Sequence, residues 1–165
     1  MHSNSSANSS ANAHLRWQCC ALDELSAPHI HAVFAARAAV FVVEQQCFYQ
    51  DPDRFDVDAQ HLIAWSGSEI AGYLRVLAPG TTYVEPSLGR ILTTKAFRGS
   101  GLGRELITRG LSEIEHRYSQ RVVRIGAQAH LEKLYASFGF QVASAPYIED
   151  GIPHIEMVRV AGKRE

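Results

Sequence analysis

The spacing of apolar residues near the start of the chain predicts a helix that begins close to residue 27. Ser26 suits a helix cap and Pro28 suits the first turn, where its missing N–H is no loss. Apolar residues then recur at helical spacing, so we expect the helix to continue to about Val43. These residues are Ile30, Val33, Phe34, Ala38 and Phe41.

A second apolar stripe at the same spacing predicts a helix from about Leu102 to Tyr118. The residues of this stripe are Leu102, Leu106, Ile107, Leu111 and Ile114. A shorter helix is expected within residues 130–140. It would end at Gly139, because glycine commonly follows the last turn of a helix.

The other apolar runs predict strands. Gly67 and Ser68 separate two of them, as in a β-hairpin. Pro86 and Gly89 interrupt a third run, and a glycine inside a strand indicates a bulge or a close backbone approach. The expected strands lie in residues 15–22, 61–66, 69–78, 81–94 and 121–128, with two more in 140–161. The order β, α, three β, α, β, α, β, β predicts an α/β (α+β) domain with one mixed sheet.

Length and composition are those of one globular domain. The chain has 165 residues, 46% of them hydrophobic and 20% charged. Residues 1–14 are low in complexity and predict a disordered tail, which leaves residues 15–165 for the domain. A net charge of −1 argues against a nucleic-acid partner, and no apolar run approaches the roughly 20 residues that span a bilayer, so we expect no membrane partner.

Cysteine and histidine spacing argues against disulfides and against a metal site. The three cysteines are odd in number and show no C-x-x-C spacing, and the eight histidines show no H-E-x-x-H pattern. The sequence therefore predicts a reduced, cytoplasmic protein without a bound metal.

Three glycines lie in five positions directly before the second predicted helix, in the stretch RGSGLGRELI (residues 98–107). Bare backbone beside the unpaired N–H groups of a first helical turn favours an anion, most often phosphate. A P-loop would need a lysine after the glycines, and a dinucleotide motif would need glycine at Arg104. A flexible turn without a ligand is the alternative.

The spacing Arg98-x-x-Gly101-x-Gly103 resembles the [Q/R]-x-x-G-x-[G/A] motif of the GNAT family of N-acetyltransferases. GRILTT (89–94) is similar to that family's bulged fourth strand, and RIGAQAHLEKLYASFGF (124–140) to its fifth strand and fourth helix. VFVVEQQCFYQDPDRFD, GAQAHLEKLYASFGF and YIEDGIPHIEM resemble the ElaA-like branch, so the likeness covers about residues 28–160. It implies a GNAT fold: a single mixed twisted sheet of six to seven strands, flanked by about four helices and splayed at the cofactor slot.

The resemblance implies transfer of an acetyl group from acetyl-CoA to an amine. Backbone N–H groups of the glycine loop would bind the pyrophosphate, and the bulged strand would pair with the pantetheine amides and polarise the thioester carbonyl. Gln128 stands near the family's usual cofactor-facing asparagine. The expected acetyl-CoA contacts are Ile91, Leu92, Thr93, Arg98, Gly99, Ser100, Gly101, Leu102, Gly103, Arg104, Gln128 and Tyr135. An edge strand of such a sheet would also let two subunits pair as a homodimer.

Direct attack by the amine needs a base for the ammonium proton and an acid for the CoA thiolate. Tyr135 falls on the family's usual tyrosine and is the expected acid. The candidate bases are Glu44, His154, Glu85, His61 and water. Cys47 would serve a ping-pong route, but it has no histidine partner nearby in sequence.

The acceptor is expected to be a small-molecule amine or a protein amine. Acidic residues crowd the two loops expected beside it; they either attract a cationic amine or are ordinary solvated carboxylates. These residues are Asp51, Asp53, Asp56, Asp58, Glu149 and Asp150. The alternative function is a non-catalytic acyl-CoA-binding module, which has no need of an acid at Tyr135.

Overall fold

The computed structural model describes residue 12 and residues 14–119 and 122–160. The strands are β1 (Arg16–Ala21), β2 (Gln60–Ser66), β3 (Glu69–Leu77), β4 (Ser87–Thr93), β5 (Val122–Gln128), β6 (Phe140–Val142), β7 (Tyr147–Glu149) and β8 (Ile152–Val160). The α-helices are α2 (Ala27–Arg37), α3 (Leu102–Tyr118) and α4 (Glu132–Ala136). A π-helical stretch, η2 (Ala38–Glu44), continues α2, so these two together form the first predicted helix. Most of the predicted tail, residues 1–14, lies outside the described residues.

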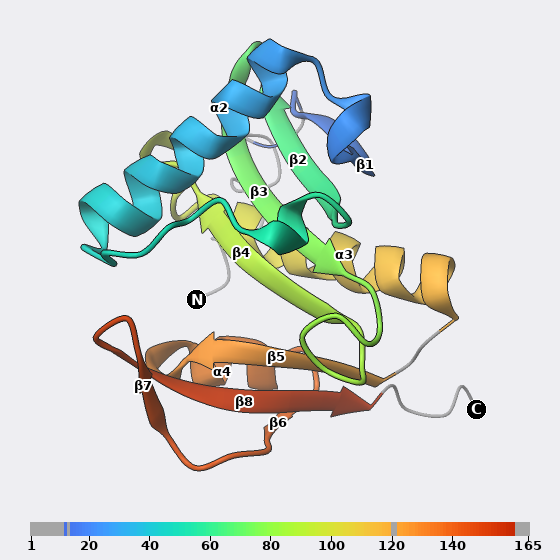
Figure 1. The fold of residues 1–165 in the computed structure, drawn as a ribbon, viewed down its shortest axis with the longest axis vertical. Coiled ribbons are helices and arrows are strands. Elements are labelled where there is room, and N and C mark those ends of the chain that lie inside the picture. The colour runs from blue at the N-terminus through green and yellow to red at the C-terminus, as the bar shows by residue number, and fades with distance from the viewer. Residues whose placement is uncertain (1–11, 13, 120–121, 161–165) are drawn as a thin grey trace, which may run out of the picture.

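The strands form two four-stranded sheets, where the sequence predicted a single sheet of six to seven strands. One sheet has the order β1-β2-β3-β4, and the other has β5-β8-β6 with β7 also paired to β8; all of these pairs are antiparallel. The Arg124 N–H donates to the Pro86 carbonyl at 3.1 Å, which ties β5 to the start of β4. From there β4 and β5 run in the same direction and diverge, so the hydrogen-bonded ladder is interrupted between them (Figure 1).

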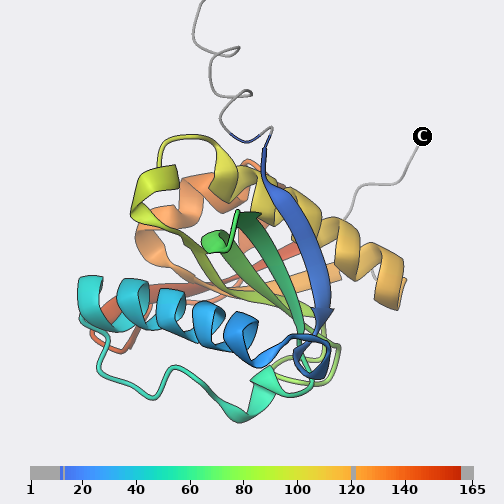
Figure 2. The same cartoon turned by 90° about the horizontal axis from the view of Figure 1, so that it is seen from above.

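Helices cover both faces of the first sheet, with α2 on one face and α3 on the other (Figures 1 and 2). The alternation along β2 explains this, because successive strand residues point to opposite faces. Leu62 and Ala64 belong to the core cluster that contains α3, while Ile63 and Trp65 belong to the cluster that contains α2. Burial on both faces accounts for the nearly continuous apolar runs of β2 and β3.

One hydrophobic cluster holds the two sheets together although their strands diverge. It contains Leu74 from β3, Leu106 from α3, and Ile125 and Met157 from β5 and β8. Gly110 lets α3 lie close to the sheet: a Cβ there would come within 3.0 Å of both Leu74 methyl groups. The gap between β4 and β5 is therefore a local feature of a shared core.

The predicted interruption of β4 is a β-bulge. Tyr73 pairs with Leu92 and Arg75 with Gly89, so Leu74 of β3 faces two residues, Arg90 and Ile91. The residue with the left-handed backbone is Arg90, at φ +52°, one position after the glycine that signalled the bulge.

The segment Ala27–Glu44, which is α2 with η2, passes a length and composition test for a membrane span, with a mean hydropathy of 1.2 over 18 residues. A core helix of a globular domain passes the same test. Its face toward the sheet buries Val33, Arg37, Val40 and Phe41.

Candidate active site

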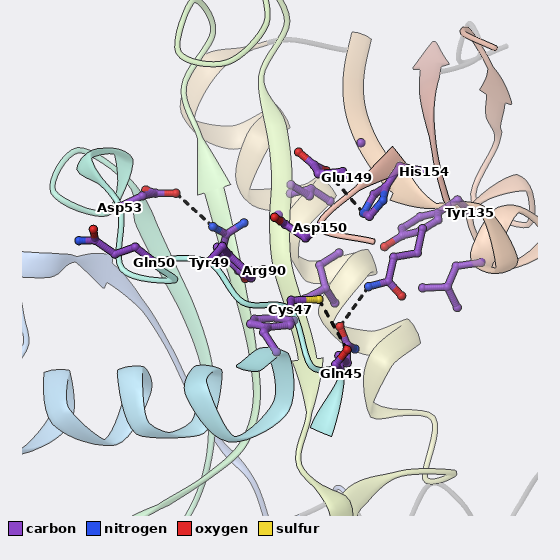
Figure 3. A pocket seen from close by; sticks show the side chains of 17 residues that line it. Gln45, Cys47, Tyr49, Gln50, Asp53, Arg90, Tyr135, Glu149, Asp150 and His154 are labelled. Atoms are coloured by element: carbon purple, nitrogen blue, oxygen red, sulfur yellow. Dashed lines mark hydrogen bonds and ion pairs between the residues drawn. The ribbon is translucent and has the colours of Figure 1, made fainter. Parts of the chain in front are cut away.

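A pocket of about 440 Å³ lies where β4 and β5 diverge (Figure 3). Its walls come from the end of η2, the segment 45–53, β4, β5, α4 and the turn between β7 and β8. Four of the predicted site residues line it: Ile91, Gln128, Tyr135 and His154. The structure thus brings together side chains from both sheets.

The glycine loop begins α3 beyond the end of β4. Gly99 and Gly101 have φ of +77° and +83°, a region that side-chain-bearing residues rarely adopt. A Cβ at Gly101 would meet no protein atom within 4 Å, so the protein itself leaves this surface open. The first-turn N–H groups of a helix have no partner within the helix and carry its positive dipole end. Ser100 takes part in the loop's own structure, its hydroxyl donating to the Phe97 carbonyl at 2.7 Å.

Arg98 and Arg104 tie this loop to neighbouring elements. Arg98 pairs with Glu44 at 2.6 Å and donates to the Thr93 carbonyl at 3.3 Å. Arg104 donates to Ser137 Oγ at 3.0 Å, and its guanidinium lies 4.7 Å from the ring centroid of Phe138. Both cations therefore lie beside the glycine loop with partners of their own.

Glu44 does not line the pocket. Its carboxylate is about 40% exposed and pairs with Arg98 at the end of η2. The structure does not bring this candidate base together with Tyr135 and His154.

Tyr135 lines the pocket from α4 and is 7% exposed. Within the described part of the chain its hydroxyl has no hydrogen-bond partner. Its ring meets Phe140 edge-on, with centroids 5.9 Å apart. Burial raises the pKa of Tyr135 to about 12, so the phenol stays protonated and can donate a proton or a hydrogen bond.

His154 lies on β8 opposite Gln128 of β5 and is held on two sides. Its Nδ1 is 2.8 Å from the Ile152 carbonyl, which can only accept, so Nδ1 carries a hydrogen. Its Nε2 is therefore the basic nitrogen of the neutral ring, and it lies 3.5 Å from Glu149 Oε2. The ring stacks on Tyr147 at 5.9 Å. Among the candidate bases, His154 is the side chain that shares the pocket with Tyr135 (Figure 3).

Gln128 lines the pocket at the end of β5. Its Nε2 donates to Gln45 Oε1 at 3.1 Å, which links the end of β5 to the segment after η2 (Figure 3). The amide predicted to face the cofactor therefore has a protein partner.

The other candidate catalytic residues fall into different surroundings. His61 is fully buried between the Tyr73 hydroxyl, at 2.6 Å, and the Asp56 carbonyl, at 2.9 Å, and burial lowers its pKa. Glu85 pairs with Arg124 at 3.2 Å and does not line the pocket. Cys47 does line it, but burial and the charge of Asp150 raise the pKa of its thiol, which disfavours the thiolate a nucleophile needs.

A closed ring of ion pairs supports one wall of the pocket, and sequence reasoning missed it. Between guanidinium nitrogens and carboxylate oxygens the distances are Arg37–Asp51 2.9 Å, Asp51–Arg90 2.9 Å, Arg90–Asp53 3.2 Å, Asp53–Arg75 2.7 Å, Arg75–Asp56 2.8 Å and Asp56–Arg37 2.7 Å. We call these six residues the Arg–Asp ring. It fastens the loop that follows η2 to α2, β3 and β4.

The ring changes the interpretation of the acidic loop. Asp51 and Asp56 are buried, and they are neither solvated nor free to attract an acceptor. Burial alone would raise the pKa of Asp56, but the hydrogen bonds and charge of Arg37 outweigh it and lower the pKa to about 2. Glu149 and Asp150, by contrast, line the pocket without an arginine or lysine partner in the part of the chain that is described. The signal that could have revealed the ring is Arg37, a cation inside an apolar helix.

Known proteins are similar to this chain in sequence and in architecture. Residues 25–161 match the family described as an acetyltransferase (GNAT) domain. Protein ElaA of Escherichia coli is 40% identical over 147 residues, which covers 88% of this chain and 96% of that protein. Its crystal structure superposes with a TM-score of 0.82, covering 88% of this chain and 99% of that one.

A further solved structure gives the same result. An acyl-CoA N-acyltransferase from Pseudomonas aeruginosa is 38% identical, with a TM-score of 0.85 over 88% of this chain and 99% of that one. The glycine loop at the start of α3, the bulged β4, the gap between β4 and β5 and these likenesses agree, and the chain belongs to the GNAT acetyltransferase family, in its ElaA-like branch.

Proposed function

We propose that this GNAT-family acyltransferase moves the acetyl group of acetyl-CoA to a primary amine by direct attack. The observation that carries the proposal is Tyr135, whose buried, protonated hydroxyl lines the pocket without a protein partner among the described residues. His154 lies in the same pocket on β8. An acid and a base in one pocket meet the two proton transfers that aminolysis of a thioester requires.

Acetyl-CoA would bind along β4 and the glycine loop. The first-turn N–H groups of α3 and the bare backbone of residues 99–103 suit the pyrophosphate. Arg98 and Arg104 lie beside the loop and would add charge-assisted contacts by turning from Glu44 and Ser137. Because β4 is the edge strand of its sheet, the backbone of Ile91 to Thr93 would pair with the pantetheine amides, as a peptide pairs with a sheet edge.

In the reaction, the acceptor ammonium first loses a proton to His154 Nε2 or to water. The free amine attacks the thioester carbonyl, whose oxygen a β4 backbone N–H would polarise. The C–S bond then breaks, and Tyr135 gives its proton to the departing thiolate. The attacking nitrogen loses its extra proton as the amide forms, and this proton restores the Tyr135 phenol. The products are an N-acetylated amine and CoA. Because Cys47 is held as a thiol by its surroundings, direct attack is preferred over a ping-pong route.

The acceptor side of the pocket favours a cationic amine. Glu149 and Asp150 contribute two carboxylates from the β7–β8 turn, whereas the aspartates of the Arg–Asp ring are already neutralised. A small-molecule amine and a protein amine both fit this description. The three free thiols, Cys19, Cys20 and Cys47, support the proposed cytoplasmic location. A homodimer stays a prediction.

Calorimetric titration with acetyl-CoA tests the cofactor, with CoA, ATP and NAD as comparison ligands. We expect micromolar binding of acetyl-CoA, and loss of that binding in Gly101→Ala, because the new Cβ would hold the pyrophosphate off the backbone. Gly80→Ala is the matched control: Gly80 also has a positive φ and open space around it, but it lies in the loop between β3 and β4. No binding by the wild type contradicts the proposal.

Tyr135→Phe separates an enzyme from an acyl-CoA-binding module. With an amine that releases free thiol from acetyl-CoA, the variant should lose roughly 10²- to 10⁴-fold in turnover, the usual contribution of a positioned acid. Its affinity for acetyl-CoA should be unchanged, because the hydroxyl makes no hydrogen bond to the residues that the structure describes. Equal turnover of variant and wild type would remove Tyr135 as the acid, and a chain that binds acetyl-CoA but acetylates no amine would be a binding module.

A further inference from the structure

Arg90 combines two unusual features at one wall of the pocket. Its backbone has φ +52°, although a side chain in the left-handed region is disfavoured. It is also one of the two residues that make the β4 bulge, and it lines the pocket with Gly89 and Ile91. Arg90 therefore keeps a backbone conformation that is unfavourable for an arginine.

The side chain of Arg90 is held on three sides. Its Nε lies 2.9 Å from Asp51 and its terminal nitrogen 3.2 Å from Asp53, while its guanidinium lies 5.0 Å from the ring centroid of Tyr49 (Figure 3). Asp51 is itself fixed from the other side by Arg37, which is fully buried. Because the ring closes on itself, the position of Arg90 is determined by groups on α2 and β3 as well as by its own strand.

We propose that the Arg–Asp ring holds Arg90 in its left-handed conformation and so maintains the bulge that shapes the acyl-CoA pocket. In this view Arg90 is a positioning residue: its side chain pairs with two aspartates, and its backbone sets the position of Ile91, which lines the pocket. The inference rests on the proposed function, since it concerns the binding of acetyl-CoA at β4.

The alternative is that the ring only stabilises the fold. Both views predict a lower melting temperature when the ring is broken, so stability alone does not separate them. They differ in what glycine does at position 90. Glycine removes the ion pairs as alanine does, but it adopts the left-handed conformation without strain.

The test compares Arg90→Ala with Arg90→Gly in the full chain by calorimetric titration with acetyl-CoA. Compared with glycine, a residue with a side chain populates the left-handed conformation roughly 5- to 30-fold less. If only this conformation binds acetyl-CoA, the apparent affinity for acetyl-CoA falls by the same factor. We therefore expect Arg90→Ala to bind acetyl-CoA about 5- to 30-fold more weakly than the wild type, and Arg90→Gly to regain most of that loss. Both variants should melt below the wild type, because both lose the two ion pairs of Arg90.

Arg124 provides the matched control. Its side chain is 25% exposed and pairs with two carboxylates, Glu85 and Glu156, as the 24% exposed side chain of Arg90 pairs with two aspartates. Arg124 lies in β5 with an ordinary negative φ and does not line the pocket. Arg124→Ala and Arg124→Gly should both bind acetyl-CoA as the wild type does, and here glycine should be the less stable of the two, because it weakens a strand.

Two results would overturn the inference. Wild-type affinity in Arg90→Ala would show that the strand keeps its bulge without the ring, and equal weakness of Arg90→Gly and Arg90→Ala would show that backbone strain is not the cause. If Arg90→Ala does not fold, Asp53→Asn is used to break the ring instead. We expect Asp53→Asn to weaken the binding of acetyl-CoA in the wild-type chain. In a chain that already carries Arg90→Gly, the same substitution should cause no further weakening. If the wild type does not bind acetyl-CoA, the proposed function and this inference are both wrong. If the wild type does bind it, the variants at position 90 test the role of the ring by itself.

Discussion

Replacing Arg37 by methionine should destabilise the protein strongly, because Arg37 is the most buried cation of the Arg–Asp ring. Its guanidinium is fully buried, pairs with Asp51 and Asp56, and donates to the Asp51 carbonyl at 2.9 Å. Methionine fills a similar space but leaves two buried carboxylates with fewer partners. Each aspartate would keep one arginine, Arg90 or Arg75.

Two estimates give the range of the magnitude. Removing one partner of a buried ion pair costs about 3–5 kcal/mol. The pKa of Asp56 is lowered from 3.8 to about 2, and a shift of this size corresponds to about 2–3 kcal/mol of favourable interaction with the carboxylate, shared between Arg37 and Arg75. We therefore expect Arg37→Met to lower the free energy of unfolding by about 3 kcal/mol, or the melting temperature by roughly 6–12 °C for a chain of this size.

Urea unfolding followed by circular dichroism measures this loss, with the m-value checked for two-state behaviour. The control is Arg117→Met, which removes an exposed ion pair with Glu113 on α3 and should change stability by at most about 0.5 kcal/mol. A loss below about 1 kcal/mol in Arg37→Met would refute the reasoning, because it would mean that desolvation of Arg37 cancels its attraction to the aspartates.

Three further predictions follow from named contacts. The folded-state pKa of Asp56 is lowered to about 2, so its contribution to stability is complete above about pH 4 and is lost as pH falls toward 2. Urea unfolding at pH 4.5 and 2.5 measures this effect. Between these two pH values, the free energy of unfolding should fall less in Asp56→Asn than in the wild type. Gly110→Val should destabilise by about 2 kcal/mol or more, measured by thermal unfolding, because a Cβ alone already meets Leu74 at 3.0 Å; an unchanged melting temperature would mean that α3 shifts freely on the sheet. His154→Gln should lower turnover roughly 10²-fold or more without weakening acetyl-CoA binding. Unchanged turnover would mean that water takes the ammonium proton. A larger loss of turnover in Glu44→Gln would mean that Glu44, and not His154, is the base.

The sequence alone determined the parts of the protein that depend on near neighbours in the chain. The helix predicted from Leu102 to Tyr118 has those bounds, and the hairpin at Gly67 and the interruption of β4 are present. The predicted strands are present too, but residues 140–161 hold three strands where two were predicted. Apolar periodicity, helix caps and glycines act over a few residues, so these elements can be predicted without the fold. The family was also recoverable from the sequence, because the glycine loop, the helix that carries Tyr135 and the ElaA-like stretches are each short local patterns.

Only the tertiary structure decided which polar side chains meet. Glu44 lies 54 positions from Arg98 and pairs with it, and Gln128 lies 83 positions from Gln45. The ring joins Asp51 to Arg90 across 39 positions. The aspartates of this loop look like surface residues in the sequence, but in the structure they support one wall of the pocket. The gap between β4 and β5 likewise appears only when both strands are placed on the shared core. Apolar periodicity specifies which face of an element is buried, but the partner of a charged side chain depends on where distant elements pack, and that depends on the whole fold.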